Sequence, residues 1–378
     1  MIDFFKNLVK PDIKPLNYIK IHKNNIVDNL WIIQSWQKDA EIWPVLKSNA
    51  YGHWLKEVSG ILKNTSGKYI CVDSFPEYQI AKKYSWKKIL VLWETRNQNY
   101  KYYDFSQTTF CVYNLQTLNF LESLNKKITI HLFLNTWMNR EWFQEDELRL
   151  ACEKFKKSKL ILEWVCSHFS SADEENFEVS EKQIEEFKSL YEIIVSYDLD
   201  PKYRHIWASG WVAKLEDDFF NAFRPGVALF WINVFHRSDS YFKKAEKLLP
   251  AMEIFSTILN TQKVASNSWI SYNHTYCFSQ DSQWAVVAFG YFEGFTRKMS
   301  NNYSVKIAKK YFPMRGNICM NLSTIEIWDE KIHIWDEVEI LSISKKAKNN
   351  IYHFAESSGT SPYEILVKIQ PNIRRIVE

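Results

Sequence analysis

The order of apolar and polar segments predicts an α/β fold, with an N-terminal (β/α)8 TIM-type barrel over residues 1–240 and a C-terminal mostly-β domain over residues 241–378. Two observations carry this prediction. From about residue 18 to residue 226, short apolar runs alternate with amphipathic stretches, which is the pattern of repeated βα units. Beyond about residue 240, strand-like runs follow one another with no long helix between them. A chain of 378 residues is long enough for one large domain and one smaller one.

The barrel strands are expected where β-branched and other apolar residues form short runs, and the helices where apolar residues recur at helical spacing. One strand begins near Ile42 and ends at Lys47, and a loop through Asn49 and Gly52 follows it. The other expected strands are residues 18–21, 69–72, 89–92, 109–112, 128–134, 160–166, 205–209 and 222–227, and the expected helices are residues 25–36, 55–62, 77–83, 115–124, 145–156 and 181–195. In such a barrel, chemistry is expected at the carboxyl ends of the strands.

The second domain is expected to be built mainly of strands. These are residues 249–259, 283–289, 303–307, 314–319, 323–327 and 337–342, and helical pieces near residues 350–356 and 363–367 complete the domain.

Composition excludes several classes of protein. A net charge of +4 is too small and too dispersed to indicate binding to nucleic acid or to an acidic membrane. The sequence contains no apolar run of 18 residues, and the first ten residues are too short and too charged for a signal peptide, so a cytoplasmic location is expected. The six cysteines are widely spaced without a CxxC pair, which favours reduced thiols over a zinc site or a disulfide framework.

Tryptophan and glycine occur in unusual amounts. The chain has 16 Trp and only 9 Gly, although average glycine usage is roughly 7%. Trp93, Trp211 and Trp335 stand at turns or beside strand ends, where positive φ is often needed and a bulky residue is costly. One explanation is a protein rich in aromatic residues. The preferred hypothesis is that several of these tryptophans are glycines, encoded by UGA in a source that reads this codon as glycine. Together the two types number 25, which is an ordinary glycine content.

Five polar side chains lie near the carboxyl ends of expected barrel strands: Lys47, Arg140, His168, Ser209 and Arg224, which precedes Gly226. Each alone has an ordinary explanation, since strand-end lysines often face solvent and a histidine is often a satisfied structural residue. Together they surround one end of the barrel. There, desolvation can lower the pKa of a lysine until it acts as a Schiff-base nucleophile. Tyr51, four residues after Lys47, could reach a phosphate held nearby.

The sequence resembles the alanine racemases over nearly its whole length, from residues 18–21 to residues 371–375. The most specific segments are Val45-Leu46-Lys47-Ser48-Asn49-Ala50-Tyr51-Gly52-His53, Ser167-His168-Phe169-Ser170-Ser171-Ala172-Asp173, Arg224-Pro225-Gly226-Val227-Ala228-Leu229, Ile270-Ser271-Tyr272, Gly290-Tyr291-Phe292-Glu293-Gly294, Gly316-Asn317-Ile318-Cys319-Met320 and Pro362-Tyr363-Glu364. The resemblance implies an enzyme built from a barrel and a β domain that uses pyridoxal 5'-phosphate (PLP). It also implies interconversion of L- and D-alanine, which supplies D-alanine for peptidoglycan in the bacterial cytoplasm.

The resemblance also implies a role for each matching residue. Lys47 would hold PLP and act as the base on one face of the substrate Cα. Tyr272 from the second subunit of a homodimer would be the base on the other face, with His168 tuning its phenol. Arg224 would face the pyridine nitrogen and keep the ring a weaker electron sink than an Asp would. The remaining implied contacts are Tyr51, Ser209, Gly226, Val227 and Tyr363 to the phosphate, Arg140 to the phenolic oxygen and the substrate, and Met320 and Tyr291 to the substrate.

Other functions are weighed against this one. A broad-specificity amino-acid racemase or a PLP-dependent decarboxylase would share the architecture, but decarboxylases of this type tend to place an acid at the pyridine nitrogen, against Arg224. A non-catalytic PLP-binding protein typically lacks the β domain and the Tyr272 segment.

The sequence departs from the family pattern at several positions. Phe133 stands where many members have a modified lysine that orients the arginine, so Arg140 would need another partner such as Asn135 or an anion. Asn321 replaces an aspartate after Met320. The family has glycine where this chain has Trp54, Trp137, Trp231, Trp269 and Trp335, and a small residue at Trp211.

Overall fold

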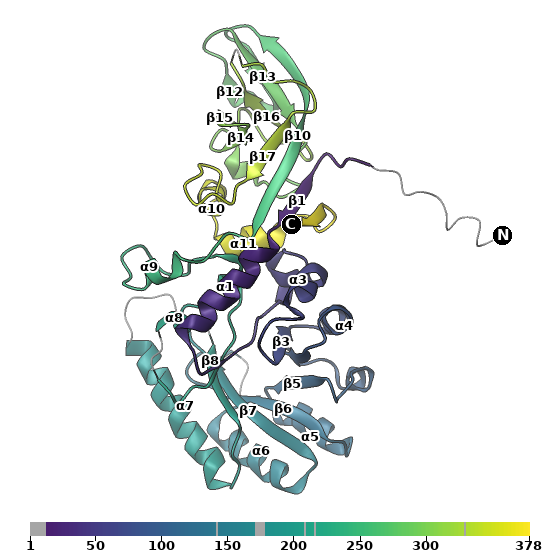
Figure 1. Cartoon of the computed structure of the whole chain (residues 1–378), viewed down its shortest axis with the longest axis vertical. Coiled ribbons are helices and arrows are strands. Elements are labelled where there is room, and N and C mark those ends of the chain that lie inside the picture. Colours follow the sequence, from purple (N-terminus) through teal and green to yellow (C-terminus); the bar gives the residue numbers. More distant parts are fainter. Residues whose placement is uncertain (1–12, 141–142, 171–177, 208, 215–216, 329) are drawn as a thin grey trace, which may run out of the picture. The chain divides into compact units, whose positions relative to one another are not determined.

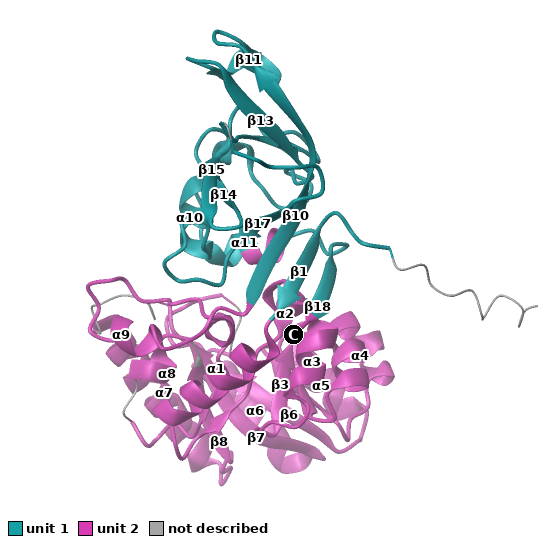
Figure 2. Ribbon diagram, turned by 45° about the horizontal axis from the view of Figure 1, so that its top comes forward, with its two compact units in different colours: residues 1–21, 252–365, 369–376 teal, residues 22–251, 366–368, 377–378 magenta. Residues whose placement is uncertain are grey.

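The computed structural model describes residues 13–378 except residues 141–142, 171–177, 208, 215–216 and 329 (Figure 1). The chain divides into two compact units (Figure 2). The barrel unit comprises residues 22–251, 366–368 and 377–378. The β unit comprises residues 252–365 and 369–376 and the described part of residues 1–21. The main chain passes from one unit to the other at residues 21–22, 251–252, 365–366, 368–369 and 376–377.

In the described part of the barrel unit, eight parallel strands close into a ring. Six of them form one sheet in sequence order: β3 (Tyr69–Val72), β4 (Lys88–Val91), β5 (Thr108–Val112), β6 (Ile128–Phe133), β7 (Leu160–His168) and β8 (Tyr203–Trp207). The other two, β2 (Glu41–Ile42) and β9 (Ala222–Phe223), pair with each other. A bridge from Val45 to Cys71 joins β2 to β3, and the Asn221 amide donates to the Arg204 carbonyl (3.1 Å) between β9 and β8. The predicted barrel is therefore confirmed.

Helices cover the outside of these strands, as Figure 2 shows in magenta. They are α1 (Lys23–Trp36), α3 (Leu55–Leu62), α4 (Phe75–Tyr84), α5 (Leu115–Ser123), α6 (Glu145–Lys157), α7 (Glu178–Ser196), α8 (Trp211–Lys214) and α9 (Phe242–Ala245). The ends of α6 carry charges that suit the helix dipole, with three acidic residues in the first turn and three lysines in the last. The barrel interior is filled largely by aromatic side chains, including Trp43, Tyr69, Phe133, Trp164 and Tyr203.

Among the described residues, the β unit is built on a mainly antiparallel sheet. Its strands run in the order β15 (Lys310–Pro313), β14 (Ser304–Ile307), β17 (Glu337–Leu341), β10 (Met252–Val264), β1 (Tyr18–Ile21) and β18 (Arg374–Val377), and β13 (Ser282–Val287) pairs with β10 and β16 (Ser323–Glu326). A small hairpin joins β11 (Trp269–Ile270) to β12 (Tyr276–Cys277). The helices α10 (Ile351–Ser358) and α11 (Pro362–Lys368) follow. The long strand β10 organises the unit because it pairs with β1, β13 and β17.

Two expectations from the sequence are wrong here. Residues 18–21 form a strand, but β1 is not a barrel strand, because Tyr18 to Ile21 pair antiparallel with Phe255 to Met252. Residues 314–319 are not a strand. The chain turns there at Gly316, whose φ is +75°, and only Met314 bridges to Ile325. Across the described residues, no helix combines the length and the apolar character that a bilayer span requires.

The backbone supports the hypothesis that several tryptophans are glycines. Within the described chain, six of them have positive φ: Trp54, Trp86, Trp137, Trp231, Trp328 and Trp335. A non-glycine residue held there costs about 1–3 kcal/mol. The expectation of positive φ holds for Trp335 and is wrong for Trp93 and Trp211. Trp211 instead begins α8 and stacks on Phe169 with ring centroids 4.4 Å apart.

The barrel interior is crowded at a further pair of tryptophans. The ring centroids of Trp43 and Trp164 lie 3.1 Å apart at an interplanar angle of 45°. Aromatic pairs are normally 4.5–7 Å apart, so two indoles do not fit this space. We therefore expect a smaller residue at one of these two positions in the natural protein.

Peptide mass spectrometry tests the tryptophan hypothesis directly. In protein isolated from its natural source, we expect glycine at positions 54, 137, 231 and 335. Tryptophan at all four positions would end the hypothesis.

A stability measurement tests the physical argument. Replacing the exposed Trp137 or Trp335 by glycine in this chain is expected to raise the free energy of unfolding by about 1–3 kcal/mol each, because glycine adopts positive φ without strain and little buried apolar surface is lost. The control is Trp31→Gly, because Trp31 is exposed inside the helix α1. This substitution should lower the free energy of unfolding by about 0.5–1 kcal/mol. Chemical denaturation measures both, and equal effects at the test and control positions would contradict the argument.

Candidate active site

The strand expected to end at Lys47 is shorter, because β2 ends at Ile42 and only Val45 bridges beyond it. Lys47 instead begins a short element, α2 (Lys47–Tyr51), in which four residues have a left-handed backbone. The φ angles of Ser48, Asn49, Ala50 and Tyr51 are 54°, 56°, 53° and 51°. Each L-residue in this conformation costs roughly 1–2 kcal/mol, so the surrounding structure must hold the segment. Local bonds do part of this: the Ala50 amide donates to the Leu46 carbonyl (2.8 Å), and the Gly52 amide donates to the Ser48 carbonyl (3.2 Å).

Gly52 ends the segment under a tight steric constraint. Its φ is +81°, and a Cβ added there would lie 2.1 Å from the Leu366 carbonyl oxygen within the barrel unit. No residue with a side chain fits without moving the backbone. Gly52 is thus required where the chain leaves the left-handed segment.

The environment of Lys47 favours its neutral amine. Burial lowers the pKa of Lys47, and the positive charges of Arg140 and Arg224 lower it further, while Asp73 and Glu77 oppose this shift. A neutral amine is the nucleophilic form of lysine. The same interactions show that Arg140 and Arg224, both predicted site residues, lie close enough to Lys47 to act on its charge.

The two arginines occupy different environments. Arg224 follows β9 and is fully buried, with its guanidinium carbon 5.2 Å from the ring centroid of Phe133. Arg140 is exposed, and its guanidinium carbon lies 5.6 Å from the ring centroid of Trp93. Asn135 accepts from the Asn139 amide (3.1 Å) and donates to its side chain (2.8 Å), which organises the turn just before Arg140.

Hydroxyl and amide groups gather around Gly226. The Ser209 hydroxyl accepts a hydrogen bond from the Gly226 amide (3.1 Å). A Cβ added to Gly226 would lie 2.3 Å from the Tyr51 hydroxyl, so this hydroxyl is also beside the Gly226 backbone. Val227 follows at the start of the 3-10 helix η3 (Val227–Phe230). Tyr51, Ser209, Gly226 and Val227, which are far apart in the sequence, are therefore brought together.

His168 is the last residue of β7. Its carbonyl accepts from the Gln183 side chain (3.0 Å), which also donates to the Thr136 carbonyl (2.6 Å). The Ser167 and Thr136 hydroxyls are 2.5 Å apart. This network joins β7, α7 and the loop before Arg140. Residues 171–173, the end of the predicted His168 segment, lie outside the described residues.

The β unit brings together the other predicted residues. Ser271 donates to the Asn317 carbonyl (2.5 Å), and the Asn317 side chain donates to the Tyr272 carbonyl (2.8 Å). The amides of Tyr291 and Phe292 donate to the carbonyls of Cys319 (3.1 Å) and Met320 (2.8 Å). The side chains of Tyr272, Tyr291 and Met320 are all exposed, Tyr272 to 65%.

Two further predicted positions also belong to the β unit. Tyr363 lies in the first turn of α11 and is partly exposed. Asn321, which replaces the aspartate of the family pattern, donates to the carboxylate of Glu293 (2.8 Å), and that carboxylate also accepts from the Gly290 amide (2.8 Å). Asn321 thus braces the loop that carries Tyr291.

Two family models match most of the chain. The family model described as "Alanine racemase, N-terminal domain" matches residues 21–234, and the model described as "Alanine racemase, C-terminal domain" matches residues 251–377.

The chain belongs to the alanine racemase family.

Individual relatives cover almost the full length. An alanine racemase of Borreliella burgdorferi is 30% identical over 359 residues, which is 93% of this chain and 94% of that protein. Alanine racemase 1 of Clostridium acetobutylicum is 29% identical, covering 96% of this chain and 95% of its own. Among solved structures, alanine racemase of Clostridium difficile 630 superposes with a TM-score of 0.88 at 27% identity, covering 97% of both chains.

Two acidic residues that act on the charge of Lys47, Asp73 and Glu77, were not predicted from the sequence. Asp73 directly follows β3, and Glu77 lies in the first turn of α4. The available signal was an acidic residue at the carboxyl end of a predicted barrel strand, followed by a second one four residues later. Within the described residues, no group of three or more acidic, His or Cys side chains is placed to hold a metal ion.

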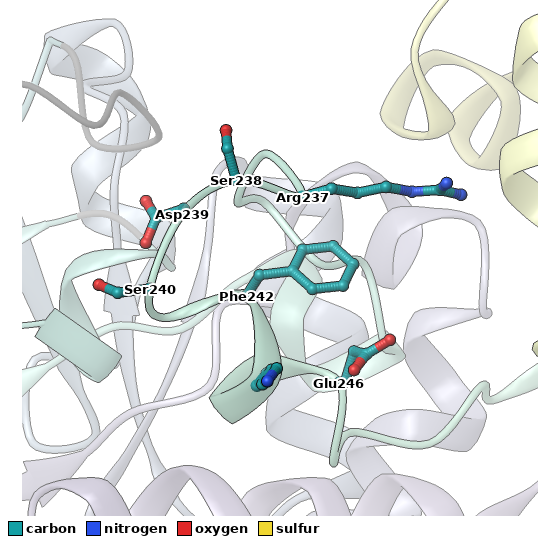
Figure 3. A pocket seen from close by; sticks show the side chains of 7 residues that line it. Arg237, Ser238, Asp239, Ser240, Phe242 and Glu246 are labelled. Carbon is teal, nitrogen blue, oxygen red and sulfur yellow. The ribbon is translucent and has the colours of Figure 1, made fainter.

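A surface cavity of about 630 Å³ lies elsewhere in the barrel unit, lined by Arg237, Ser238, Asp239, Ser240, Phe242, Lys243 and Glu246 (Figure 3). None of these residues is a predicted site residue. Asp239 forms an ion pair with Lys214 (2.7 Å), and both side chains are almost fully buried. This pair holds the segment that lines the cavity in place. Because none of the lining residues is a predicted site residue, we assign the cavity no part in the site.

Substitution of Gly226 tests the packing around Tyr51. Gly226→Ala is expected to lower the free energy of unfolding by about 1–3 kcal/mol, because the new Cβ overlaps the Tyr51 ring and hydroxyl. Gly60→Ala is the matched control. Nothing lies within 4 Å of a Cβ at Gly60, inside α3, so this change should stabilise by about 0.5–1 kcal/mol. Equal effects in thermal unfolding would contradict the close approach of Tyr51 to Gly226.

Proposed function

We propose that this protein interconverts L- and D-alanine by a two-base mechanism with PLP as cofactor. The observation that carries the proposal is Lys47. Its side chain is partly buried, its amine has a lowered pKa, and it lies within electrostatic reach of Arg140 and the buried Arg224. Alanine racemases match the chain over nearly its full length. One solved relative at 26% identity is described as a complex with cycloserine, which supports an amino-acid substrate for that enzyme.

The residues present suit PLP. A neutral amine at Lys47 can bond covalently to an aldehyde. The hydroxyls of Tyr51 and Ser209 and the backbone of Gly226 and Val227 form a cluster of small polar groups with no side chain at Gly226, which suits a phosphate. Tyr363 would add a further hydroxyl to the phosphate. Bound PLP supplies the electron sink that makes the substrate Cα proton removable.

Racemisation needs a base on each face of the substrate Cα. Lys47 would exchange the proton on one face, and the phenol of Tyr272 from a second subunit would exchange it on the other. Tyr272 is exposed in the β unit, where Tyr291 and Met320 come from neighbouring segments. We therefore propose a homodimer in which the C-terminal domain, residues 241–378, completes the active site of the partner's barrel, residues 1–240.

The remaining site residues position the reacting groups. Arg224 would face the pyridine nitrogen, where a guanidinium cannot readily give up its proton. Arg140 would contact the phenolic oxygen of the cofactor and the substrate carboxylate, beside Met320 and Tyr291. His168 would tune the Tyr272 phenol through hydrogen bonds. The product D-alanine would serve peptidoglycan synthesis in a bacterial cytoplasm.

Removal of the Lys47 amine tests the proposed chemistry. Lys47→Ala is expected to abolish the PLP absorbance of the purified protein and to slow exchange of the alanine α-proton in heavy water by more than about 10²-fold. Lys157→Ala, on the exposed end of α6, is the control and should change neither. Release of carbon dioxide from amino acids by the wild type, without racemisation, would indicate a decarboxylase. PLP binding without either reaction would indicate a non-catalytic binding protein.

Subunit complementation tests the role of Tyr272 in the partner's site. Lys47→Ala and Tyr272→Phe chains should each be defective alone. Co-expressed in equal amounts, they should recover about one quarter of wild-type activity, because half of the dimers are mixed and each mixed dimer has one intact site. If Tyr272 served its own chain, no intact site would form and no activity would return. Light scattering of the wild type should show a dimer, and an active monomer would also overturn the proposal.

A further inference from the structure

The left-handed segment after Lys47 is tied to the neighbouring strand end by one carboxylate. Glu77 accepts a hydrogen bond from the Asn49 amide (2.7 Å) with one oxygen and from the Asp73 amide (3.2 Å) with the other. Asn49 lies in the left-handed segment, two residues after Lys47, and Asp73 directly follows β3. A single side chain therefore links α2 and the β3–α4 loop at their backbones.

Asn49 extends this link to the next helix. Its side-chain oxygen accepts from the Leu55 amide (2.8 Å) at the start of α3, and its carbonyl accepts from the Trp54 amide (3.1 Å). The backbone amide of Asn49 thus bonds to Glu77, while its side-chain and carbonyl oxygens bond to the amides at the start of α3. Loss of the Glu77 contact would leave a strained segment without its bond to α4.

Glu77 also acts on the charge of Lys47. The negative charges of Asp73 and Glu77 raise the pKa of the Lys47 amine, against burial and the two arginines. We propose that Glu77 is a positioning residue for the reaction: its carboxylate holds Ser48 to Tyr51 in the left-handed conformation and places a negative charge beside the Lys47 amine. This inference rests on the proposed function of Lys47 as cofactor lysine and base.

The groups that face Glu77 explain how its charge responds to pH. Burial raises the pKa of Glu77 to about 7, the nearby Asp73 carboxyl raises it further, and the two backbone amides oppose the shift. Lys47, which lies in the field of Glu77, also senses Asp73, Arg140 and Arg224. The charge on Glu77 therefore forms as the pH rises through about 7, and this charge raises the pKa of Lys47.

Two variants separate the geometry from the charge. Glu77→Gln keeps the side-chain length and one acceptor oxygen but removes the charge. Glu77→Asp keeps the charge but withdraws the oxygen from the Asn49 amide. Glu94→Gln is the matched control: Glu94 follows β4, accepts from the Tyr113 amide (2.6 Å) in the next loop, and is not among the charges that act most strongly on Lys47.

The first readout is the pKa of Lys47 in cofactor-free protein, measured from the pH dependence of its carbamylation by cyanate with peptide mass spectrometry. In Glu77→Gln the amine should react about threefold faster at about pH 8, where Glu77 of the wild type is mostly charged, because the pKa of Lys47 falls when the negative charge is removed. Glu77→Asp and Glu94→Gln should match the wild type. An unchanged Lys47 profile in Glu77→Gln, or an equal change in Glu94→Gln, would overturn the electrostatic role.

The second readout is the kinetics of the PLP-loaded protein. Glu77→Asp is expected to lower kcat about tenfold with KM changed much less, because the base is misplaced while substrate contacts remain. Unchanged kcat in Glu77→Asp would overturn the geometric role, and failure of both Glu77 variants to fold would make Glu77 a folding residue instead. If the wild type neither binds PLP nor racemises alanine, the proposed function fails, whereas the Lys47 labelling still decides whether Glu77 acts on the amine.

Discussion

The barrel unit depends on a backbone constraint at one strand end: four successive residues without glycine, Ser48 to Tyr51, are left-handed. Such a segment is unfavourable by itself and persists only where its surroundings determine it. Gly52 closes it under a carbonyl that no side chain could approach, and Glu77 holds its Asn49 amide. The consequence is that Lys47 and Tyr51, at its two ends, are both directed toward one edge of the ring.

That edge collects groups whose charges act on one another. Burial and two arginines favour the neutral Lys47 amine, while two carboxylates limit the effect. The Arg224 guanidinium is buried against Phe133, a residue that stands where many family members carry a modified lysine. In this chain Arg140 instead follows a turn that is held by a hydrogen bond from the Asn139 amide to the Asn135 side chain. The two arginines that the resemblance implies are therefore present, but the groups that position them differ from those of many family members.

The β unit has a different organisation. Three segments around Tyr272, Tyr291 and Met320 present exposed side chains. Backbone hydrogen bonds join the Tyr291 and Met320 segments, and bonds from the side chains of Ser271 and Asn317 join the Tyr272 segment to them. Exposed aromatic groups on a rigid framework suit recognition by another surface better than a hydrophobic core. This is the physical basis for proposing that each half of the site is completed by a second copy of the chain.

The sequence by itself determined the type of most elements, because the apolar periodicity of helices such as α3 and of strands such as β3 is local. It also indicated Lys47, Arg224 and Ser209 through their places after strands. The excess of tryptophan over glycine was equally visible, whereas only the backbone identified which positions have positive φ. Tertiary structure alone placed residues 18–21 in the β unit, since their partner β10 lies more than 200 residues away. It alone also brought Asp73 and Glu77 to Lys47, because neighbouring parallel strands end at one edge and sequence separation does not record that proximity.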